Sequence, residues 1–169
     1  MSAGSGGLRL RPYQPEDFAH IRSWIGDART HAFWCAWRFS WPLTREDFED
    51  RLRELTAVSG LKPFVAETEE GVPVGFLCTS PGPSEGETTL KFVVIDPSRR
   101  GKGFGREMVS LASEAAGTGT VRLSVFTPNV SAIRCYERAG FVTERVEEGE
   151  FAFHEERWGR CHMALRISR

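Results

Sequence analysis

The sequence predicts a mixed α/β domain, because stretches with the pattern of strands alternate with stretches with the pattern of helices. Residues 90–95 and 121–126 have the apolar, β-branched composition of buried strands. Between them, residues 103–116 place Met108, Leu111 and Ala112 on one face of a helix. A chain of 169 residues with this order of elements is compatible only with the mixed α/β class.

The first half of the chain is expected to contribute three strands and two helices. The first helix opens at residues 15–17, where two acidic side chains suit the positive end of a helix dipole. The second begins at Thr44, which can cap it, with Asp47 three residues further on. Residues 70–73 predict a hairpin turn. The three strands are expected at residues 8–11, 64–68 and 74–79.

The second half is expected to alternate strands and helices. In order, we expect a strand at residues 88–95, a helix at 103–116, a strand around Leu123, a short helix at 131–139, and strands at 142–147 and 161–167. No internal repeat or interdomain linker interrupts this series. We therefore expect residues 8–169 to form a single domain and residues 1–7 to form a disordered amino-terminal tail.

The bulk composition argues against several classes of function. The formal net charge of −1 gives no field that attracts nucleic acid or anionic lipid, so we expect neither a nucleic-acid nor a membrane partner. No apolar run is long enough to span a bilayer, and the amino terminus does not resemble a signal peptide, so we expect a cytoplasmic protein. The four cysteines form no C-x-x-C pair, which predicts neither a disulfide framework nor a zinc site.

The segment between the strand at 88–95 and the helix at 103–116 has the features of a diphosphate-binding loop. Three glycines leave main-chain N–H groups unscreened, and the following helix directs its positive end at them. These glycines are Gly101, Gly103 and Gly105. The cationic side chains of the segment are Arg99, Arg100, Lys102 and Arg106.

Two other kinds of phosphate loop do not fit this segment. A P-loop places Lys and then Ser or Thr after its last glycine, whereas Gly105 is followed by Arg106 and Glu107. A dinucleotide fingerprint has the spacing G-x-G-x-x-G near the start of a βαβ unit, whereas the spacing here is G-x-G-x-G.

Two motifs resemble those of the GNAT superfamily of N-acetyltransferases, and the pair is specific. Arg100-x-x-Gly103-x-Gly105, preceded by Asp96-Pro97, resembles the acyl-CoA loop of that family. Downstream, a run with the pattern N-x-x-A-x-x-x-Y-x-x-x-G-F resembles the second motif, with Asn129, Ala132, Tyr136, Gly140 and Phe141 at its named positions. The resemblance extends over nearly the whole chain and is greatest to the branch that contains the ribosomal-protein N-terminal acetyltransferases.

The resemblance implies a GNAT fold, with a mixed, mostly antiparallel sheet whose fourth and fifth strands splay apart and with helices on both faces. It also implies that acetyl-CoA lies in that gap, with its pantetheine arm along the fourth strand and its diphosphate on the loop. The residues implied to bind the cofactor are Val93, Val94, Ile95, Arg99, Arg100, Gly101, Lys102, Gly103, Phe104, Gly105, Arg106, Asn129, Ala132 and Tyr136. The ring of Phe104 is expected to pack beneath the loop.

The same resemblance suggests how acetyl transfer would proceed. The main-chain N–H of Val94 or of Ile95 would polarise the thioester carbonyl. Tyr136 would donate its phenolic proton to the leaving thiolate, although a buried Tyr that only orders the short helix fits the pattern too. Asn129 would bond the pantetheine arm or cap the helix.

The chain departs from the pattern of better-understood GNAT enzymes at the expected position of the general base. Many GNAT enzymes carry a Glu on the fourth strand, but the corresponding residues 90–92 include no carboxylate. The remaining candidates are Glu87, Asp96, His154 and Glu155, or a chain of waters. An α-amine asks less of a base than a Lys side chain does, so the missing Glu favours an α-amine or a weakly basic acceptor.

Acceptor specificity is expected from residues 30–42, an otherwise irregular stretch that is crowded with aromatic side chains. These rings either wall an acceptor pocket or pack beneath a loop. The candidate acceptor-binding residues are Phe33, Trp34 and Trp37, together with Trp158 and His154 on the terminal hairpin. No histidine stands in a metal-ligand pattern, so we expect no metal.

The leading hypothesis is an acetyl-CoA-dependent N-acetyltransferase that acts on a primary amine of a small molecule, a peptide or a protein terminus. The alternative from another class is a non-catalytic acyl-CoA-binding module. The sequence leaves open whether the acyl group is acetyl or longer, and whether the chain forms a homodimer.

Overall fold

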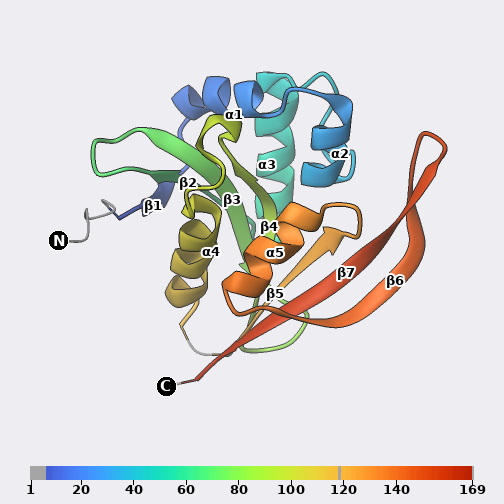
Figure 1. Cartoon of the computed structure of the whole chain (residues 1–169). Coiled ribbons are helices and arrows are strands. Elements are labelled where there is room, and N and C mark those ends of the chain that lie inside the picture. Colours follow the sequence, from blue (N-terminus) through green and yellow to red (C-terminus); the bar gives the residue numbers. More distant parts are fainter. Residues whose placement is uncertain (1–6, 118, 169) are drawn as a thin grey trace.

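A single seven-stranded sheet forms the centre of the computed structural model, which describes residues 7–117 and 119–168 (Figure 1). The strand order is β1-β2-β3-β4-β5-β7-β6. β4 and β5 run parallel, and the other neighbouring strands of the described chain run antiparallel. The strands are β1 Arg9–Pro12, β2 Lys62–Glu67, β3 Pro73–Pro81, β4 Glu87–Ile95, β5 Gly119–Phe126, β6 Val142–Phe153 and β7 Glu156–Ile167.

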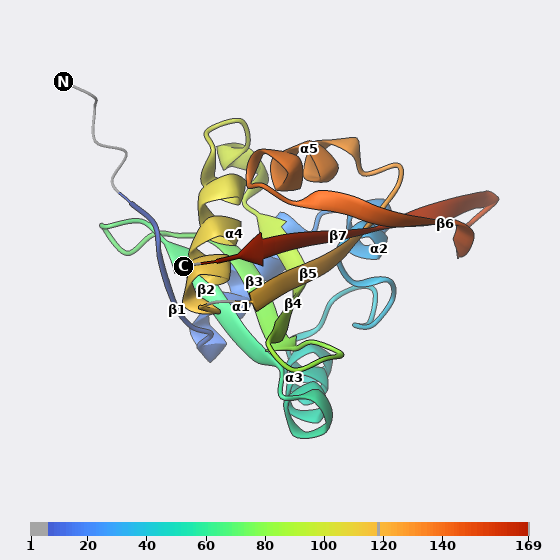
Figure 2. The same ribbon diagram turned by 90° about the horizontal axis from the view of Figure 1, so that it is seen from below.

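Helices cover both faces of the sheet, so the expected fold class is confirmed. α4 and α5 pack on one face, and α1, α2 and α3 pack on the other (Figure 2). Two cores result, one under each group of helices, with the β3 and β4 side chains alternating between them. The helices are α1 Phe18–Trp24, α2 Ala28–Cys35, α3 Arg45–Ser59, α4 Phe104–Ala115 and α5 Val130–Arg138, with short 3-10 turns at Pro15–Asp17 and Pro97–Arg99.

The two central parallel strands separate after a short contact. β4 pairs with β5 only from Glu87, opposite Thr120, to Thr89, opposite Arg122. Beyond Thr89, β5 remains paired with β7, whereas the β5-facing side of β4 has no strand partner. The expected splaying of the fourth and fifth strands is therefore confirmed, and it leaves a row of main-chain polar groups available along β4.

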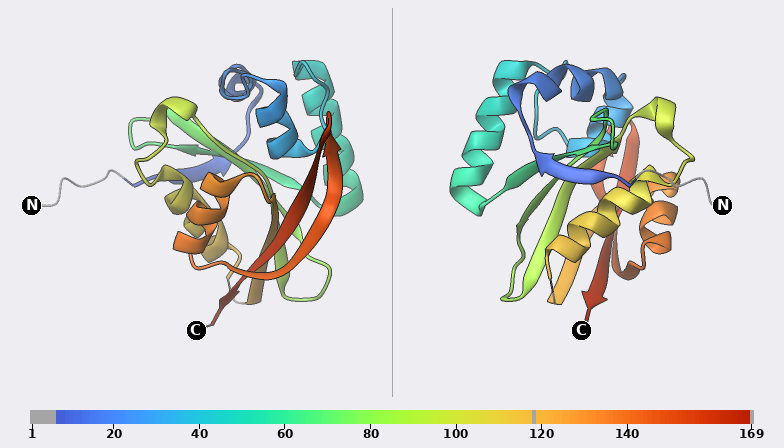
Figure 3. Two further views of the ribbon diagram at one scale, coloured as in Figure 1. Left: turned by 45° about the vertical axis from the view of Figure 1, so that its right-hand side comes forward. Right: turned by 90° about the vertical axis from the view of Figure 1, so that its left-hand side faces the viewer.

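The terminal hairpin is longer than the sequence pattern indicated. β6 continues to Phe153 instead of ending at residue 147, and β7 begins at Glu156 instead of residue 161. The far half of the hairpin curls beside α2 (Figures 1 and 3). Arg29 of α2 donates to Glu156 of β7 at 2.6 Å, and the Phe33 and Trp158 rings lie 4.6 Å apart. The hairpin therefore forms one wall of the region in front of the parted strands.

One helix was not expected. α3 begins as predicted, since the Thr44 hydroxyl accepts from the Asp47 N–H, but residues 28–35 also form a helix within the stretch expected to be irregular. Its residues are mostly moderate helix formers, so local pattern gives little signal. The Asp27 side chain caps it by accepting from the Thr30 N–H at 2.7 Å, and packing against the sheet stabilises it.

A cluster of ion pairs holds the start of the chain to the sheet. The Arg11 guanidinium donates twice to Asp17 at 2.8 Å and once to Glu67 at 2.7 Å, and both carboxylates are at most 5% exposed. Burial alone would raise the pKa of Asp17, but the Arg11 hydrogen bonds leave it lowered. The Arg11 hydrogen bond also lowers the pKa of Glu67.

Three further features are the cysteine side chains, the possibility of a membrane-spanning helix, and the amino-terminal tail. The four cysteines are free; Cys35, Cys78 and Cys161 are buried, whereas Cys135 is only partly buried. Within the described chain, no helix has the length and apolarity needed to cross a membrane. Residues 1–6 of the expected disordered tail lie outside the described residues.

Candidate active site

The glycine loop has the geometry that its sequence predicted. Gly101 and Gly103 adopt φ values of 79° and 81°, which L side chains rarely tolerate, and Gly103 forms the N-cap of α4. A Cβ added at either position would meet no atom within 4 Å. The loop thus presents an open stretch of main chain at a helix N-terminus, an arrangement that fits a diphosphate.

The side chains of the loop divide into free cations and packing residues. Arg100, Lys102 and Arg106 are exposed, and they make no ion pair within residues 7–117 and 119–168. Arg99 lies 3.8 Å from Asp96, whose carboxylate also accepts from the Ser98 N–H. The loop residues at positions 104 and 105 instead face the interior of the domain.

The Phe104 ring is partly buried against the core under α4 and α5, as expected. A Cβ on Gly105 would lie 3.1 Å from the Cys135 sulfur of α5. This glycine is therefore needed for the close contact of the two helices, and its small size has a packing reason besides any role in binding.

A β-bulge in β4 marks the place where the strands part. Phe92 and Val93 together lie opposite one residue of β3, since Val94 pairs with Phe76 and Lys91 pairs with Cys78. Phe92 is held at φ 55°, which is uncommon for a residue with a side chain.

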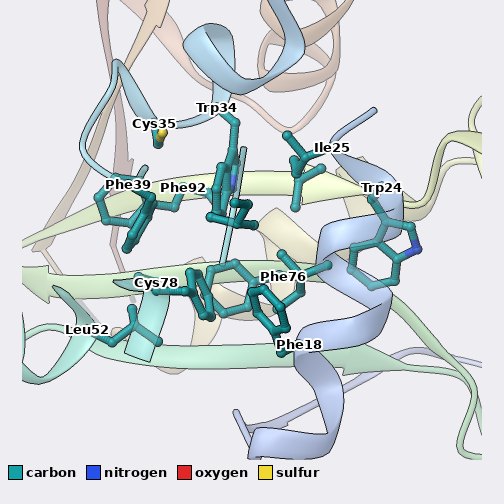
Figure 4. Packing of buried hydrophobic residues seen from close by; sticks show 14 of the residues in the cluster. Phe18, Trp24, Ile25, Trp34, Cys35, Phe39, Leu52, Phe76, Cys78 and Phe92 are labelled. Carbon is teal, nitrogen blue, oxygen red and sulfur yellow. The ribbon is translucent and has the colours of Figure 1, made fainter. Parts of the chain in front are cut away.

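Trp34 of α2 stabilises this bulge, because its indole N–H donates to the Phe92 carbonyl at 2.8 Å (Figure 4). The Phe92 ring packs with Phe39 at 5.0 Å between centroids. Val93, Val94 and Ile95 follow the bulge and lead directly to the glycine loop. A strained backbone that is held by buried contacts is characteristic of functional sites.

Tyr136 of α5 is buried in the core beneath α4 and α5. Its side chain is 8% exposed, and burial raises its pKa, so the phenol stays protonated at neutral pH. The hydroxyl has no hydrogen-bond partner in the part of the chain that the structure describes. On the same helix, Ala132 packs against the core.

Asn129 is the N-cap residue of α5, but its side chain makes no capping hydrogen bond. The expected capping role is therefore wrong. The reason is its backbone conformation, φ −82° and ψ 65°, which is not the extended one from which a cap side chain reaches the first turn. The binding role stays a prediction.

A cavity of about 160 Å³ lies where β4 and β5 part, on the α2 side of the sheet. We call it the strand-gap cavity; it is lined by residues 33–36, 38, 89–92, 124–126 and 160. Phe33 and Trp34 of the expected acceptor residues belong to this lining. Trp34 lines the cavity and also packs in the core beneath it, so the packing interpretation holds for this ring, and the acceptor pocket stays a prediction.

The other three expected acceptor residues lie outside that lining. Trp37 is 42% exposed and its ring stacks on Phe153 at 6.0 Å. Trp158 is only 1% exposed, so its ring supports Phe33 from beneath. His154 lies at the exposed turn between β6 and β7.

A second, more polar cavity of about 420 Å³ adjoins the first and shares Thr89 and Ser124 with it. We call it the polar cavity; its lining includes Glu87, Arg122, Glu144 and His162. Here the Ser124 hydroxyl and His162 Nδ1 lie 2.9 Å apart, and His162 Nε2 lies 2.9 Å from Glu147 Oε1. Hydroxyl, imidazole and carboxylate thus form one hydrogen-bonded chain that ends at the strand-gap cavity.

The chain matches the Acetyltransferase (GNAT) family over residues 26–141. It belongs to this family. The streptothricin acetyltransferase of Streptomyces lavendulae is 34% identical over 83 residues, which are 47% of this chain and 44% of that protein. An uncharacterized N-acetyltransferase of Methanocaldococcus jannaschii is 32% identical over 124 residues, 69% of this chain and 49% of that one. The chain spans less than half the length of these two relatives.

Solved structures show the same fold. The spermidine N-acetyltransferase of Vibrio cholerae, in a complex with CoA and spermine, superposes with a TM-score of 0.77 at 20% identity. The alignment covers 94% of this chain and 95% of that one.

Among the GNAT base candidates drawn from the sequence, Glu87 lines the polar cavity, whereas the other three line neither of these two cavities. Arg122 lies 3.1 Å from the Glu87 carboxylate. Asp96 caps the turn before the glycine loop. The Ser124–His162–Glu147 chain was missed, because its members lie on three strands that only the sheet register brings together. Glu147, Glu150 and His162 also offer donor atoms within 4.8 Å of one another, as a metal site would, but exposed acidic groups commonly do so.

Proposed function

We propose that this protein is an acetyl-CoA-dependent N-acetyltransferase that acetylates a primary amine of a small molecule or peptide. One observation carries the proposal. The unpaired edge of β4 joins the open glycine loop at one end to the strand-gap cavity at the other. A cofactor held at its diphosphate would therefore have its distal end beside the cavity.

The residues that would hold the cofactor fit it chemically. Main-chain N–H groups of residues 101–105 and the free cations Arg100, Lys102 and Arg106 suit a diphosphate. The β4 edge at residues 93–95 can pair with the amides of a pantetheine arm, as an added strand does. When bound, acetyl-CoA supplies an acetyl group activated as a thioester.

Three groups of the chain would serve the transfer. In the overall reaction the amine nitrogen forms a bond to the acetyl carbon, the bond from that carbon to sulfur breaks, and the amine loses a proton. Asp96 donates its N–H to the Val74 carbonyl, so by the antiparallel alternation the Val94 N–H also faces β3, whereas the Ile95 N–H faces the unpaired edge. Of the two expected donors, Ile95 would therefore stabilise the negative charge on the carbonyl oxygen. Tyr136 would give its proton to the sulfur.

The proton from the amine would pass to the Ser124 oxygen as Ser124 hands its own proton to His162 Nδ1. Glu147, hydrogen-bonded to the other ring nitrogen, would stabilise the resulting imidazolium. This pathway offers the base that the fourth strand lacks.

The names of similar proteins support an amine acceptor, but the acceptors that they name differ in chemical structure. One relative is a streptothricin acetyltransferase, and a structural neighbour acetylates spermidine. Both names describe acetyl transfer to amine-bearing compounds, and this is the class proposed here.

The second candidate, a non-catalytic acyl-CoA-binding module, is favoured by one observation: residues 90–92 of β4 include no carboxylate. Incubating the protein with acetyl-CoA and a broad panel of primary amines, while measuring released thiol, separates the two. The enzyme requires amine-dependent thiol release; a protein that binds CoA and releases no thiol with any amine is a module.

Tyr136→Phe sharpens this test. It should retain CoA affinity, because the ring remains in its packing site, and should lower kcat on the order of 10²-fold, as loss of a general acid does. An unchanged kcat would remove Tyr136 from the reaction.

A further inference from the structure

The strand-gap cavity has an uneven charge. Three cationic side chains belong to its lining, Arg38, Lys91 and Arg160, while none of its described lining residues is a carboxylate. Arg160 is partly committed elsewhere, since its Nε lies 3.2 Å from Glu150 and its guanidinium lies 4.7 Å from the Phe126 ring centroid. Arg38 and Lys91 make no ion pair within the described ranges 7–117 and 119–168.

Arg38 and Lys91 also stand close enough to affect each other. Burial lowers the pKa of Lys91, and the positive charge of Arg38 lowers it further. Lys91 is partly buried and Arg38 is exposed at the rim of the cavity, and two like charges placed side by side are unfavourable unless an anion joins them. This arrangement therefore favours occupation by a negatively charged group.

The cofactor's own diphosphate cannot be that anion. Lys91 precedes the end of β4 by four residues, which is roughly 13 Å of extended strand. Its partner across the sheet, Cys78, belongs to the core under α1–α3, so Lys91 faces the side of the sheet opposite α4 and the glycine loop. The two groups of cations serve separate anions.

The position of these cations connects them to the acceptor. They lie beside the Phe92 bulge, where the thioester is expected, and line the cavity together with residues of α2. The neighbouring polar cavity differs, because its carboxylates are matched by cations: Arg122 contacts Glu87 and Glu144 at 3.1 and 3.3 Å.

We propose that the acceptor carries an anionic group, such as a carboxylate, close to its primary amine, and that Arg38 and Lys91 bind this group in the strand-gap cavity. The inference rests on the acetyltransferase function proposed above and names its substrate class. The same positive charges would disfavour an ammonium in the cavity and so favour the neutral amine that attacks the thioester.

Matched acceptors test the proposal. Each set shares one side chain and consists of an amino acid, its carboxamide and the amine that lacks the carboxyl group; sets are built on alanine, phenylalanine and glutamate. A diamine represents cationic acceptors. The measured quantity is kcat/KM for thiol release in wild type, Arg38→Gln and Lys91→Gln.

Lys62→Gln serves as the matched control, because it removes one positive charge from an exposed site at the start of β2, outside the cavity lining. For each variant we take the ratio of kcat/KM for the carboxylate acceptor to kcat/KM for its carboxamide. Comparing this ratio between variants cancels the difference in intrinsic reactivity of the two amines. A CoA-dependent thermal shift confirms that each variant folds and binds the cofactor.

We expect wild type to prefer the carboxylate member, and the ratio to fall about tenfold in Arg38→Gln and in Lys91→Gln, while Lys62→Gln keeps it. Equal or faster acetylation of neutral or cationic acceptors by wild type would overturn the inference and leave the proposed function standing. A carboxylate preference that survives both cavity substitutions would overturn the assignment to Arg38 and Lys91. No thiol release with any amine, despite CoA binding, would overturn the proposed function itself.

Discussion

Gly103 and Gly71 form a matched pair for testing the diphosphate loop. Gly103 has φ 81° and Gly71, in the turn between β2 and β3, has φ 83°; an added Cβ would meet no atom within 4 Å at either position. A leucine should therefore strain the backbone equally at both sites, by roughly 1–2 kcal/mol. Only at Gly103 would its side chain stand over the N–H groups at the start of α4.

The expected difference is in ligand binding. At a CoA concentration about 100 times the wild-type Kd, bound ligand stabilises the fold by about 2.7 kcal/mol. A hundredfold loss of affinity in Gly103→Leu would reduce this to about 0.4 kcal/mol, whereas Gly71→Leu should keep the full value.

Urea denaturation with and without CoA measures both quantities for each variant. The ligand-free free energies of unfolding should drop by similar amounts, and the CoA-dependent increments should separate. If Gly103→Leu retained the wild-type increment, the assignment of the diphosphate to this loop would be refuted, because no other change distinguishes the two variants.

Three further predictions follow from buried or hydrogen-bonded groups. Trp34→Phe leaves the Phe92 carbonyl without its buried donor, so urea denaturation should show a loss of about 1–3 kcal/mol; full stability would mean that the bulge does not need this bond. His162→Gln should lower kcat and spare CoA affinity, and an unaltered kcat would exclude the proposed proton pathway. Arg11→Gln should destabilise the fold by roughly 3 kcal/mol at neutral pH, because it leaves the buried Asp17 carboxylate without its cation and leaves Glu67 with Arg9 alone. Arg11 keeps the pKa values of these carboxylates low, so its contribution is complete above about pH 5 and is lost as the pH falls further; a difference between wild type and variant that does not shrink in acid would contradict this account.

Local features of the site were predictable from the sequence, and the glycine loop is the clearest case. Its positive φ angles, its N–H groups and the start of α4 all arise within a few consecutive residues. The place of Tyr136 on a short helix was predictable for a similar reason, because most of its motif lies in α5.

The acceptor side was much less predictable. The sequence did not predict α2, because its residues have modest helix propensity and its stability comes from packing. The role of Trp34 depends on a carbonyl 58 residues away in the sequence. Asn129 shows the opposite case, in which a residue favoured at helix caps sits at the cap position with a backbone that prevents capping.

By itself, the sequence determined the class of fold, the order of its elements apart from α2, and the conformation of the glycine loop, because hydrophobic periodicity and glycine conformations act over short stretches of chain. Tertiary structure alone decided which side chains meet in front of the parted strands. Ser124, His162 and Glu147, like Arg38 and Lys91, come from separate elements, and sheet register and helix docking place them together. Their proximity results from packing of the whole chain, which no local spacing of residues encodes.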